Sequence, residues 1–151
     1  MNKIVLLMIL GITFLPACRS DQLIEKAQLK VNDIESLVKD KKLAVIIPNT
    51  GCSGCISTAE SFLQLNSNNS NILFVLTKIV SKKHLRLKLG NLDILNAPNI
   101  ILDDNNDFIF STEESFYPII LYLKKGKVVK GDFQSPNSPK ALEEALLSIN
   151  D

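Results

Sequence analysis

The sequence predicts an α/β fold, in which helices cover a central mixed sheet. Short uninterrupted apolar runs, typical of strands buried on both faces, alternate with stretches whose apolar residues recur at helical spacing. The last two apolar runs are separated only by a short turn that contains glycine, which indicates an antiparallel hairpin. With 151 residues, of which 46% are hydrophobic and 22% charged, the chain is large enough for one such core. Alternating strands and helices followed by a hairpin predict a layered α/β sandwich.

The N-terminus predicts a lipoprotein signal peptide over residues 1–17. Lys3 precedes an uncharged apolar run over residues 4–15, which is too short for a membrane-spanning helix of roughly 20 residues. The run ends in Leu15-Pro16-Ala17-Cys18, which resembles the lipobox of bacterial lipoproteins. The resemblance implies that Cys18 becomes the new N-terminus and carries a lipid, which anchors the protein to a membrane of the bacterial cell envelope, facing the periplasm. A simple cleaved signal and a buried first helix are the alternatives.

The charge of the chain gives no sign of a polyanionic partner. The whole chain has 17 Lys and Arg residues against 16 Asp and Glu residues, and removal of residues 1–17 takes away only Lys3. The mature chain is therefore formally neutral, and no nucleic acid or acidic partner is expected. We expect membrane attachment to come from the acyl chains on Cys18 and not from a basic patch.

Residues 20–40 predict an amphipathic helix, because apolar residues recur every three or four positions. This helix could pack on the domain or act as a spacer from the membrane, and we assign residues 18–40 to a lipid-anchored N-terminal segment. The domain itself, residues 41–151, opens with a buried strand at residues 43–47. The apolar positions of the helix are Leu23, Ala27, Val31, Ile34 and Val38.

Three elements follow the two cysteines discussed below. An apolar stripe at mostly helical spacing runs to Leu65, an Asn- and Ser-rich surface loop comes next, and residues 72–76 predict a second buried strand. Residues 81–95 fit either a strand or a helix. We favour a helix, because Ser81 can cap its start and Gly90 can end its first segment.

The C-terminal third predicts a short strand, a β-hairpin and a final helix. Gly126 suits the turn of the hairpin. Pro139 suits the first position of the helix, where the N–H that proline lacks has no intrahelical partner. The expected ranges are residues 98–102 for the strand, 118–129 for the hairpin and 139–149 for the helix.

The chemistry that the sequence offers lies at Gly51-Cys52-Ser53-Gly54-Cys55. Two cysteines separated by two residues at the start of a helix lie one turn apart, close enough for a disulfide. Such a short loop adds little stability, because the entropy removed from the unfolded chain grows with loop length, so a redox role is indicated. Free N–H groups and the helix dipole favour a thiolate there, which makes Cys52 the expected nucleophile and Cys55 the resolving cysteine. In an exported protein the pair would meet an oxidising compartment, where disulfides persist.

At this motif the chain resembles the thioredoxin superfamily, and most closely the redoxin-type thioredoxin-like lipoproteins of bacterial envelopes. The matching features are the strand at residues 43–47, the CxxC motif that opens a helix, and the proline strand with its hairpin at residues 117–129. The resemblance covers residues 41–150 and implies a thioredoxin-like three-layer α/β/α sandwich with a central mixed sheet. It also implies a membrane-tethered thiol–disulfide oxidoreductase that exchanges disulfides with protein or small-molecule substrates. A redox partner, which no residue identifies, would set the direction of electron flow.

The resemblance further implies a substrate-binding site at Tyr117 and Pro118. Pro118 would be cis and would face the cysteines, and the backbone of Tyr117 would pair with an extended substrate segment. The alternative is an ordinary trans proline on an edge strand.

Departures from the family's pattern keep a second interpretation open. Gly51 takes the place of the usual Trp, Ser53-Gly54 replaces Gly-Pro, and Ile46 stands where a buried acid assists the resolving cysteine. Glu60, one turn past the second cysteine, is a weak candidate for that role and is expected to be solvated. The alternative function is a non-catalytic accessory or binding lipoprotein that keeps the fold and the disulfide.

No cofactor and no metal site are expected. The two cysteines with His84, the only histidine, would suit a copper-binding chaperone, but His84 lies among cations that repel a metal ion. The acidic stretch at residues 103–107 lacks the Gly and the distal Glu of a calcium loop and predicts a turn. The basic stretch at residues 82–88 predicts a polar helix face, which near a membrane could touch anionic lipid.

Overall fold

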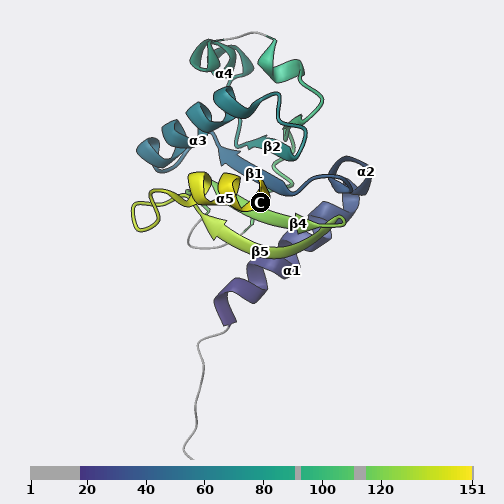
Figure 1. Ribbon diagram of the computed structural model, residues 1–151. Coiled ribbons are helices and arrows are strands. Elements are labelled where there is room, and N and C mark those ends of the chain that lie inside the picture. The colour runs from purple at the N-terminus through teal and green to yellow at the C-terminus, as the bar shows by residue number, and fades with distance from the viewer. Residues whose placement is uncertain (1–17, 91–92, 111–114, 151) are drawn as a thin grey trace, which may run out of the picture.

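The computed structural model describes residues 18–90, 93–110 and 115–150 (Figure 1). The predicted signal peptide, residues 1–17, lies outside the described residues. None of the helices in the described part of the chain is long and apolar enough to cross a membrane. The elements in chain order are α1 (Cys18–Asp33), α2 (Glu35–Val38), β1 (Leu43–Pro48), α3 (Ser53–Asn66), β2 (Ile72–Thr77), α4 (Lys82–Leu89), the 3₁₀ helix η1 (Ile94–Asn96), β3 (Ile100–Leu102), β4 (Ile119–Lys124), β5 (Lys127–Phe133) and α5 (Ala141–Asn150).

The strands form one five-stranded mixed sheet in the order β3-β2-β1-β4-β5. β1 and β3 are both parallel to β2, whereas β4 is antiparallel to β1 and forms a hairpin with β5. The turn of the hairpin is tight, because Lys125 and Gly126 both have positive φ angles, as a two-residue type I′ turn requires. Every residue of β1 and β2 is buried. The two strands therefore have almost only apolar residues, which is why continuous apolar runs predicted them.

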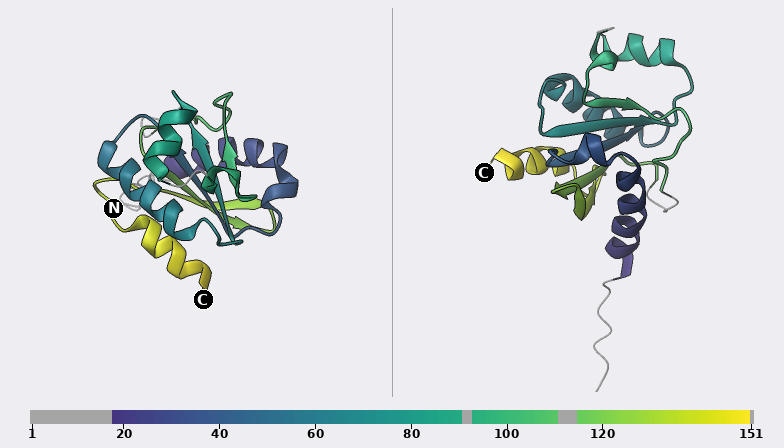
Figure 2. Two further views of the ribbon diagram at one scale, coloured as in Figure 1. Left: turned by 90° about the horizontal axis from the view of Figure 1, so that it is seen from above. Right: turned by 90° about the vertical axis from the view of Figure 1, so that its right-hand side faces the viewer.

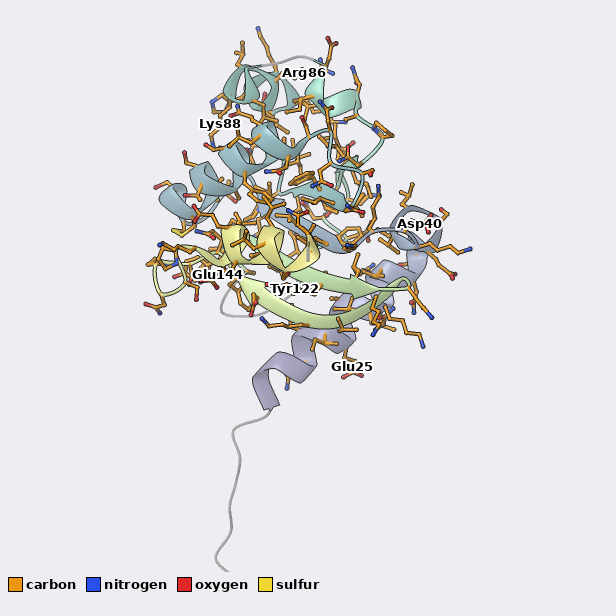
Figure 3. All side chains as sticks on the ribbon, viewed as in Figure 1. Glu25, Asp40, Arg86, Lys88, Tyr122 and Glu144 are labelled. Carbon is orange, nitrogen blue, oxygen red and sulfur yellow. A yellow bond between two sulfur atoms is a disulfide. The ribbon has the colours of Figure 1, made fainter. Side chains whose placement is uncertain are left out.

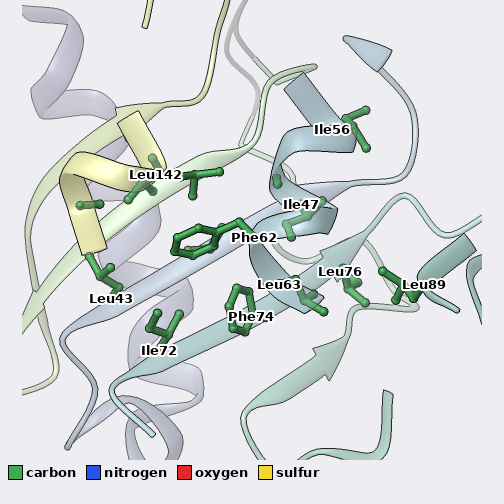
Figure 4. Close-up of a cluster of buried hydrophobic side chains, with 14 of the residues drawn as sticks. Leu43, Ile47, Ile56, Phe62, Leu63, Ile72, Phe74, Leu76, Leu89 and Leu142 are labelled. Atoms are coloured by element: carbon green, nitrogen blue, oxygen red, sulfur yellow. The ribbon is translucent and has the colours of Figure 1, made fainter. Parts of the chain in front are cut away.

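Helices cover both faces of the sheet (Figure 2). Alternate residues of β1 point to opposite faces, so Leu43 and Ile47 join a core formed with α3, α4 and α5 (Figure 4), whereas Ala44 and Ile46 join a second core formed with α1. In the first core, the rings of Phe62 and Phe74 meet edge to face at 6.1 Å. The predicted three-layer α/β/α sandwich with a central mixed sheet is therefore confirmed, with the cysteine-bearing helix directly after the central strand.

Helix α1 is part of the second core and not a free spacer. Leu23, Ala27 and Val31 are fully buried against the sheet. The Gln28 side-chain oxygen accepts the backbone N–H of Val128 at 2.7 Å, and the absence of a side chain at Gly131 leaves room for Leu23. Because residue 23 lies beside residue 131 and residue 28 beside residue 128, α1 runs antiparallel to β5.

The single helix predicted for residues 20–40 is wrong in one respect, because the chain is broken at Ile34. There the backbone has φ −121° and ψ 30°, and the N–H of Ile34 bonds to the carbonyl of Val31 in a tight turn. The break starts the short helix α2 and lets Val38 enter the second core.

Other predictions also differ from the structure. Gly90 ends α4 in a left-handed conformation as expected, and in the described part of the remaining predicted helix, residues 93–95, the chain forms the start of the 3₁₀ helix η1 and no α-helix. The final helix begins at Ala141 and not at Pro139, because the Gln134 side chain bonds to the carbonyl of Pro139 and to the N–H of Leu142 and holds the intervening residues in a turn. Leu65, placed on the buried stripe of α3 by its spacing, is 86% exposed.

Candidate functional site

Cys52 and Cys55 form a disulfide at the N-terminus of α3, with their Cα atoms 5.4 Å apart. Cys52 is the N-cap residue, and the first intrahelical bond runs from the N–H of Ile56 to the carbonyl of Cys52 at 2.9 Å. The N–H groups of residues 53–55 precede that first bond, so they point toward the end of the helix where the Cys52 sulfur lies. When the disulfide is reduced, these groups and the helix dipole favour a thiolate at Cys52.

The two cysteines differ in exposure. Cys52 is half-buried, whereas Cys55 is only 7% exposed and faces the interior. An incoming sulfur atom can therefore reach Cys52 more easily than Cys55. The roles of nucleophile for Cys52 and of resolving residue for Cys55 stay a prediction, which this asymmetry favours.

Gly51 is required by a close approach between two loops. Its φ angle is +151°, and a Cβ atom at this position would lie 2.3 Å from the carbonyl oxygen of Phe116 and 2.9 Å from its Cα atom. The same carbonyl accepts the N–H of Cys52 at 3.0 Å. A larger residue, such as Trp, would collide with the backbone of Phe116.

The segment that carries the predicted substrate-binding residues thus lies beside the disulfide. Phe116 contacts Gly51 and is 46% exposed, its ring meets the half-buried Tyr117 ring edge to face at 5.6 Å, and Pro118 is buried. A role of Tyr117 and Pro118 in substrate binding stays a prediction. Phe116 was not singled out from the sequence, although a Phe-Tyr-Pro run at the start of a strand is a visible signal of an aromatic surface.

Two further residues hold this segment in place. The Lys78 ammonium donates a hydrogen bond to the carbonyl of Ser115 at 2.9 Å. The backbone N–H of Gln134 donates to the carbonyl of Pro118, also at 2.9 Å. Neither role has a local sequence signal, because each bond joins residues that are distant in the chain.

Glu60 is not solvated, contrary to the expectation from the sequence. It is one of the few buried charged residues, and its carboxylate pairs with the Lys88 ammonium of α4 at 2.8 Å. The carboxylate is therefore engaged toward α4. Ile46 is buried in a strand that has no acidic residue, so β1 offers no acid to the resolving cysteine.

The described residues contain no group of three or more His, Cys, Asp or Glu side chains that could hold a metal ion. His84 is exposed on α4, where its backbone N–H is capped by the Ser81 hydroxyl at 3.3 Å. The acidic stretch forms the predicted turn, because the buried Asp103 carboxylate accepts the N–H groups of Asp107 and Phe108 at 2.8 and 2.9 Å. Each carboxylate oxygen of Asp103 thus accepts one backbone N–H within the turn.

Comparisons with known proteins give a likeness in structure only. No protein-family model matches the sequence, and no curated protein matches it. A candidate thioredoxin from Neisseria meningitidis, whose structure was solved in solution, is similar in fold at a TM-score of 0.47 and 18% sequence identity. The likeness covers 77% of this chain and 79% of that chain.

Proposed function

We propose that this protein is a thiol–disulfide oxidoreductase that acts through Cys52 and Cys55. The observation that carries the proposal is the disulfide itself, which joins an accessible N-cap cysteine to a buried cysteine one turn later. The half-exposed aromatic segment next to Gly51 offers an apolar surface to a polypeptide substrate. Because the disulfide closes so short a loop, it contributes little to stability and is better suited to exchange.

The exchange follows from the difference in exposure. In the reductive direction, the Cys52 thiolate attacks a substrate disulfide, one substrate sulfur leaves as a thiolate, and a mixed disulfide joins Cys52 to the substrate. The Cys55 thiolate then attacks the Cys52 sulfur, which releases the second substrate thiolate and restores the Cys52–Cys55 disulfide. Two electrons pass to the substrate, both substrate sulfurs take up protons, and an external dithiol must reduce the protein again. The reverse sequence oxidises a substrate dithiol.

The test traps the intermediate. In a Cys55→Ser variant, the resolving step is lost, so Cys52 should accumulate covalent adducts with substrate that disappear on addition of reductant. A Cys52→Ser variant is the matched control, and both variants also carry Cys18→Ser. The one thiol left in the control is then the buried Cys55, so the control should form far fewer adducts. If both variants stay monomeric after exposure to cell-envelope extract and to a model protein disulfide, the oxidoreductase proposal is wrong.

We further propose that the protein is a lipoprotein of the bacterial cell envelope, anchored through Cys18 and facing the periplasm. The support is the lipobox-like sequence directly before α1. Metabolic labelling with a radioactive fatty acid should label the wild-type protein and not a Cys18→Ser variant. Equal labelling of the two, or no labelling of either, would exclude a lipid on Cys18.

A non-catalytic accessory lipoprotein is the second candidate, and a specific observation favours it. β1 is entirely apolar and the carboxylate of Glu60 is paired with Lys88, so neither β1 nor Glu60 offers Cys55 a free acid to take its proton. The reduction potential of the pair, measured by thiol trapping in graded glutathione buffers, separates the two candidates. A potential in the range of cellular dithiol carriers supports exchange, whereas a disulfide that resists reduction supports the accessory function.

A further inference from the structure

The chain from Cys18 onward is formally neutral, but its fold gathers lysines at one end. Residues 39–42, before β1, and residues 124–127, at the turn between β4 and β5, together carry six lysines and one acidic residue, Asp40. The two segments touch, because a Cβ placed on Gly126 would lie 3.8 Å from the Cα atom of Lys39. Figure 3 shows this end of the molecule around the labelled Asp40. The lysine pole, as we call it, consists of Lys39, Lys41, Lys42, Lys124, Lys125 and Lys127.

Most charges of the lysine pole are available to a partner. The ammonium groups of Lys41 and Lys42 donate to backbone carbonyls. The other four lysines are exposed and make no ion pair with any residue that the structure describes. A cluster of unneutralised ammonium groups creates a positive local potential even where the net charge is zero.

Exposed apolar side chains accompany the lysines. The pole borders an open hollow of about 510 Å³, and the residues around it include Tyr122 and Val129. Val129 is 54% exposed, and Leu37, in the helix that directly precedes the pole, is 43% exposed. Lysines next to exposed aliphatic side chains suit a membrane interface, where ammonium groups meet lipid phosphates and aliphatic groups enter the headgroup region.

The same surface is less suited to nucleic acid. Single-stranded nucleic acid is held by aromatic rings on which bases stack. The aromatic ring at the pole, Tyr122, is half-buried and has the Lys130 ammonium over it at 4.7 Å. It therefore offers no open stacking platform.

The lysine pole lies at the end of the sheet opposite to the disulfide. Leu43, the first residue of β1, pairs with Tyr122 next to the hairpin turn, whereas the disulfide follows Pro48 at the other end of the strand. The strand is 6 residues long, so about 20 Å separate the two ends. A surface bound at the lysine pole would leave Cys52 accessible.

From these observations we propose that the lysine pole binds an anionic membrane surface through the phosphate groups of its lipids. The basic face of α4 is a poorer candidate, because Lys82 is paired with Asp104 at 2.6 Å and Lys88 with Glu60 at 2.8 Å. The proposal is independent of the exchange chemistry at the disulfide. It replaces the expectation, drawn from net charge alone, that acyl chains are the only attachment to the membrane.

The test measures the binding of the full-length chain to two kinds of vesicle. One is pure phosphatidylcholine, and the other is an equal mixture of phosphatidylcholine and phosphatidylglycerol. The apolar N-terminal run contributes to both and is the same in every variant, so the ratio of the two binding constants isolates the electrostatic part. The variant carries Lys39→Gln, Lys124→Gln and Lys127→Gln. Lys125 stays unchanged because its positive φ angle belongs to the turn. At about fivefold per lysine, the ratio should fall on the order of a hundredfold at low ionic strength.

The matched control removes three positive charges from α4, through Lys82→Gln, Lys83→Gln and Arg86→Gln. It should keep most of the preference for phosphatidylglycerol, and high salt should abolish the preference of the wild-type chain. Three results would overturn the proposal: a wild-type ratio near one, an equal loss in both triple variants, or tighter binding of a single-stranded oligonucleotide than of the anionic vesicles. Thiol–disulfide exchange rates in solution should be equal in all three proteins, which separates this proposal from the proposed function.

Discussion

The contact between Gly51 and Phe116 predicts that Gly51→Ala damages both the stability and the site. At φ +151° an alanine is strained, and its Cβ would lie 2.3 Å from the carbonyl oxygen of Phe116. Backbone strain of this kind costs about 1–3 kcal/mol, and forcing a methyl group into filled space costs a similar amount. Relief by movement of Phe116 would break the bond from the N–H of Cys52, which is worth about 1 kcal/mol. We therefore expect a loss of about 3 kcal/mol in the free energy of unfolding.

The assay is denaturation by urea of the oxidised protein, combined with hydrogen exchange of the Cys52 amide. In the Gly51→Ala variant the unfolding midpoint should fall and the Cys52 amide should exchange faster, because its acceptor has moved. Gly54→Ala is the matched control, since a Cβ there meets no atom within 4 Å, and the variant should lose no stability. If Gly51→Ala unfolds at the wild-type midpoint with an equally protected amide, the close approach does not govern this loop.

Three further outcomes follow from contacts in the fold. Lys88→Met leaves the buried Glu60 carboxylate without its cation and should lower the unfolding free energy, measured by urea denaturation, by roughly 2 kcal/mol. Adding Glu60→Gln to this variant removes the unpaired charge and should recover part of the lost stability. No recovery would show that the charge is not the cause. Burial, assisted by the Asp132 carboxylate, raises the pKa of Tyr122 to about 12 from its ordinary value of 10.0. The folded state keeps a proton that the unfolded state loses above pH 10, so the unfolding free energy should fall between about pH 10 and 12. Because the ring is half-exposed, the expected fall is only about 1 kcal/mol, and it should be absent in Tyr122→Phe; an identical pH profile in that variant would contradict the assignment. Gln134→Ala removes the side chain that bonds to the carbonyl of Pro139 and to the N–H of Leu142 at the start of α5, and it should lower the unfolding free energy by about 2 kcal/mol. Thermal melting measures this loss. An unchanged melting temperature would mean that water replaces both bonds.

The elements that the sequence predicted well are those whose signal is local. The runs at residues 43–47 and 72–76 are apolar throughout because both strands are buried on both faces. Ser81 and Gly90 mark the ends of α4 through their own caps. β5 extends further than predicted, because Lys130, Gly131 and Asp132 interrupt its apolar run while the strand, at the edge of the sheet, continues to Phe133.

The features that the sequence did not predict depend on contacts between distant residues. The residues next to Glu60 in the sequence do not predict its burial. The burial of its carboxylate depends on the ion pair with Lys88, which lies on another helix. The requirement for glycine at position 51 comes from Phe116, whose backbone lies against it and leaves no room for a side chain. The sequence does not predict the lysine pole either, because its two segments are distant in the chain and each is only a short basic stretch. The register between β1 and β4 brings them together.

The packing of α1 limits the distance between the domain and the bilayer if Cys18 carries a lipid. Leu23 is the first buried residue of α1 that the structure describes, so residues 18–22 are all that could unwind without opening the second core. Fully extended, those residues reach about 18 Å at most, roughly half the diameter expected for a domain of this size. An anchored copy would thus search a thin layer next to the bilayer and not the full depth of its compartment. Its encounters with embedded proteins would occur at high effective concentration, whereas soluble partners would have to diffuse to the membrane to meet it.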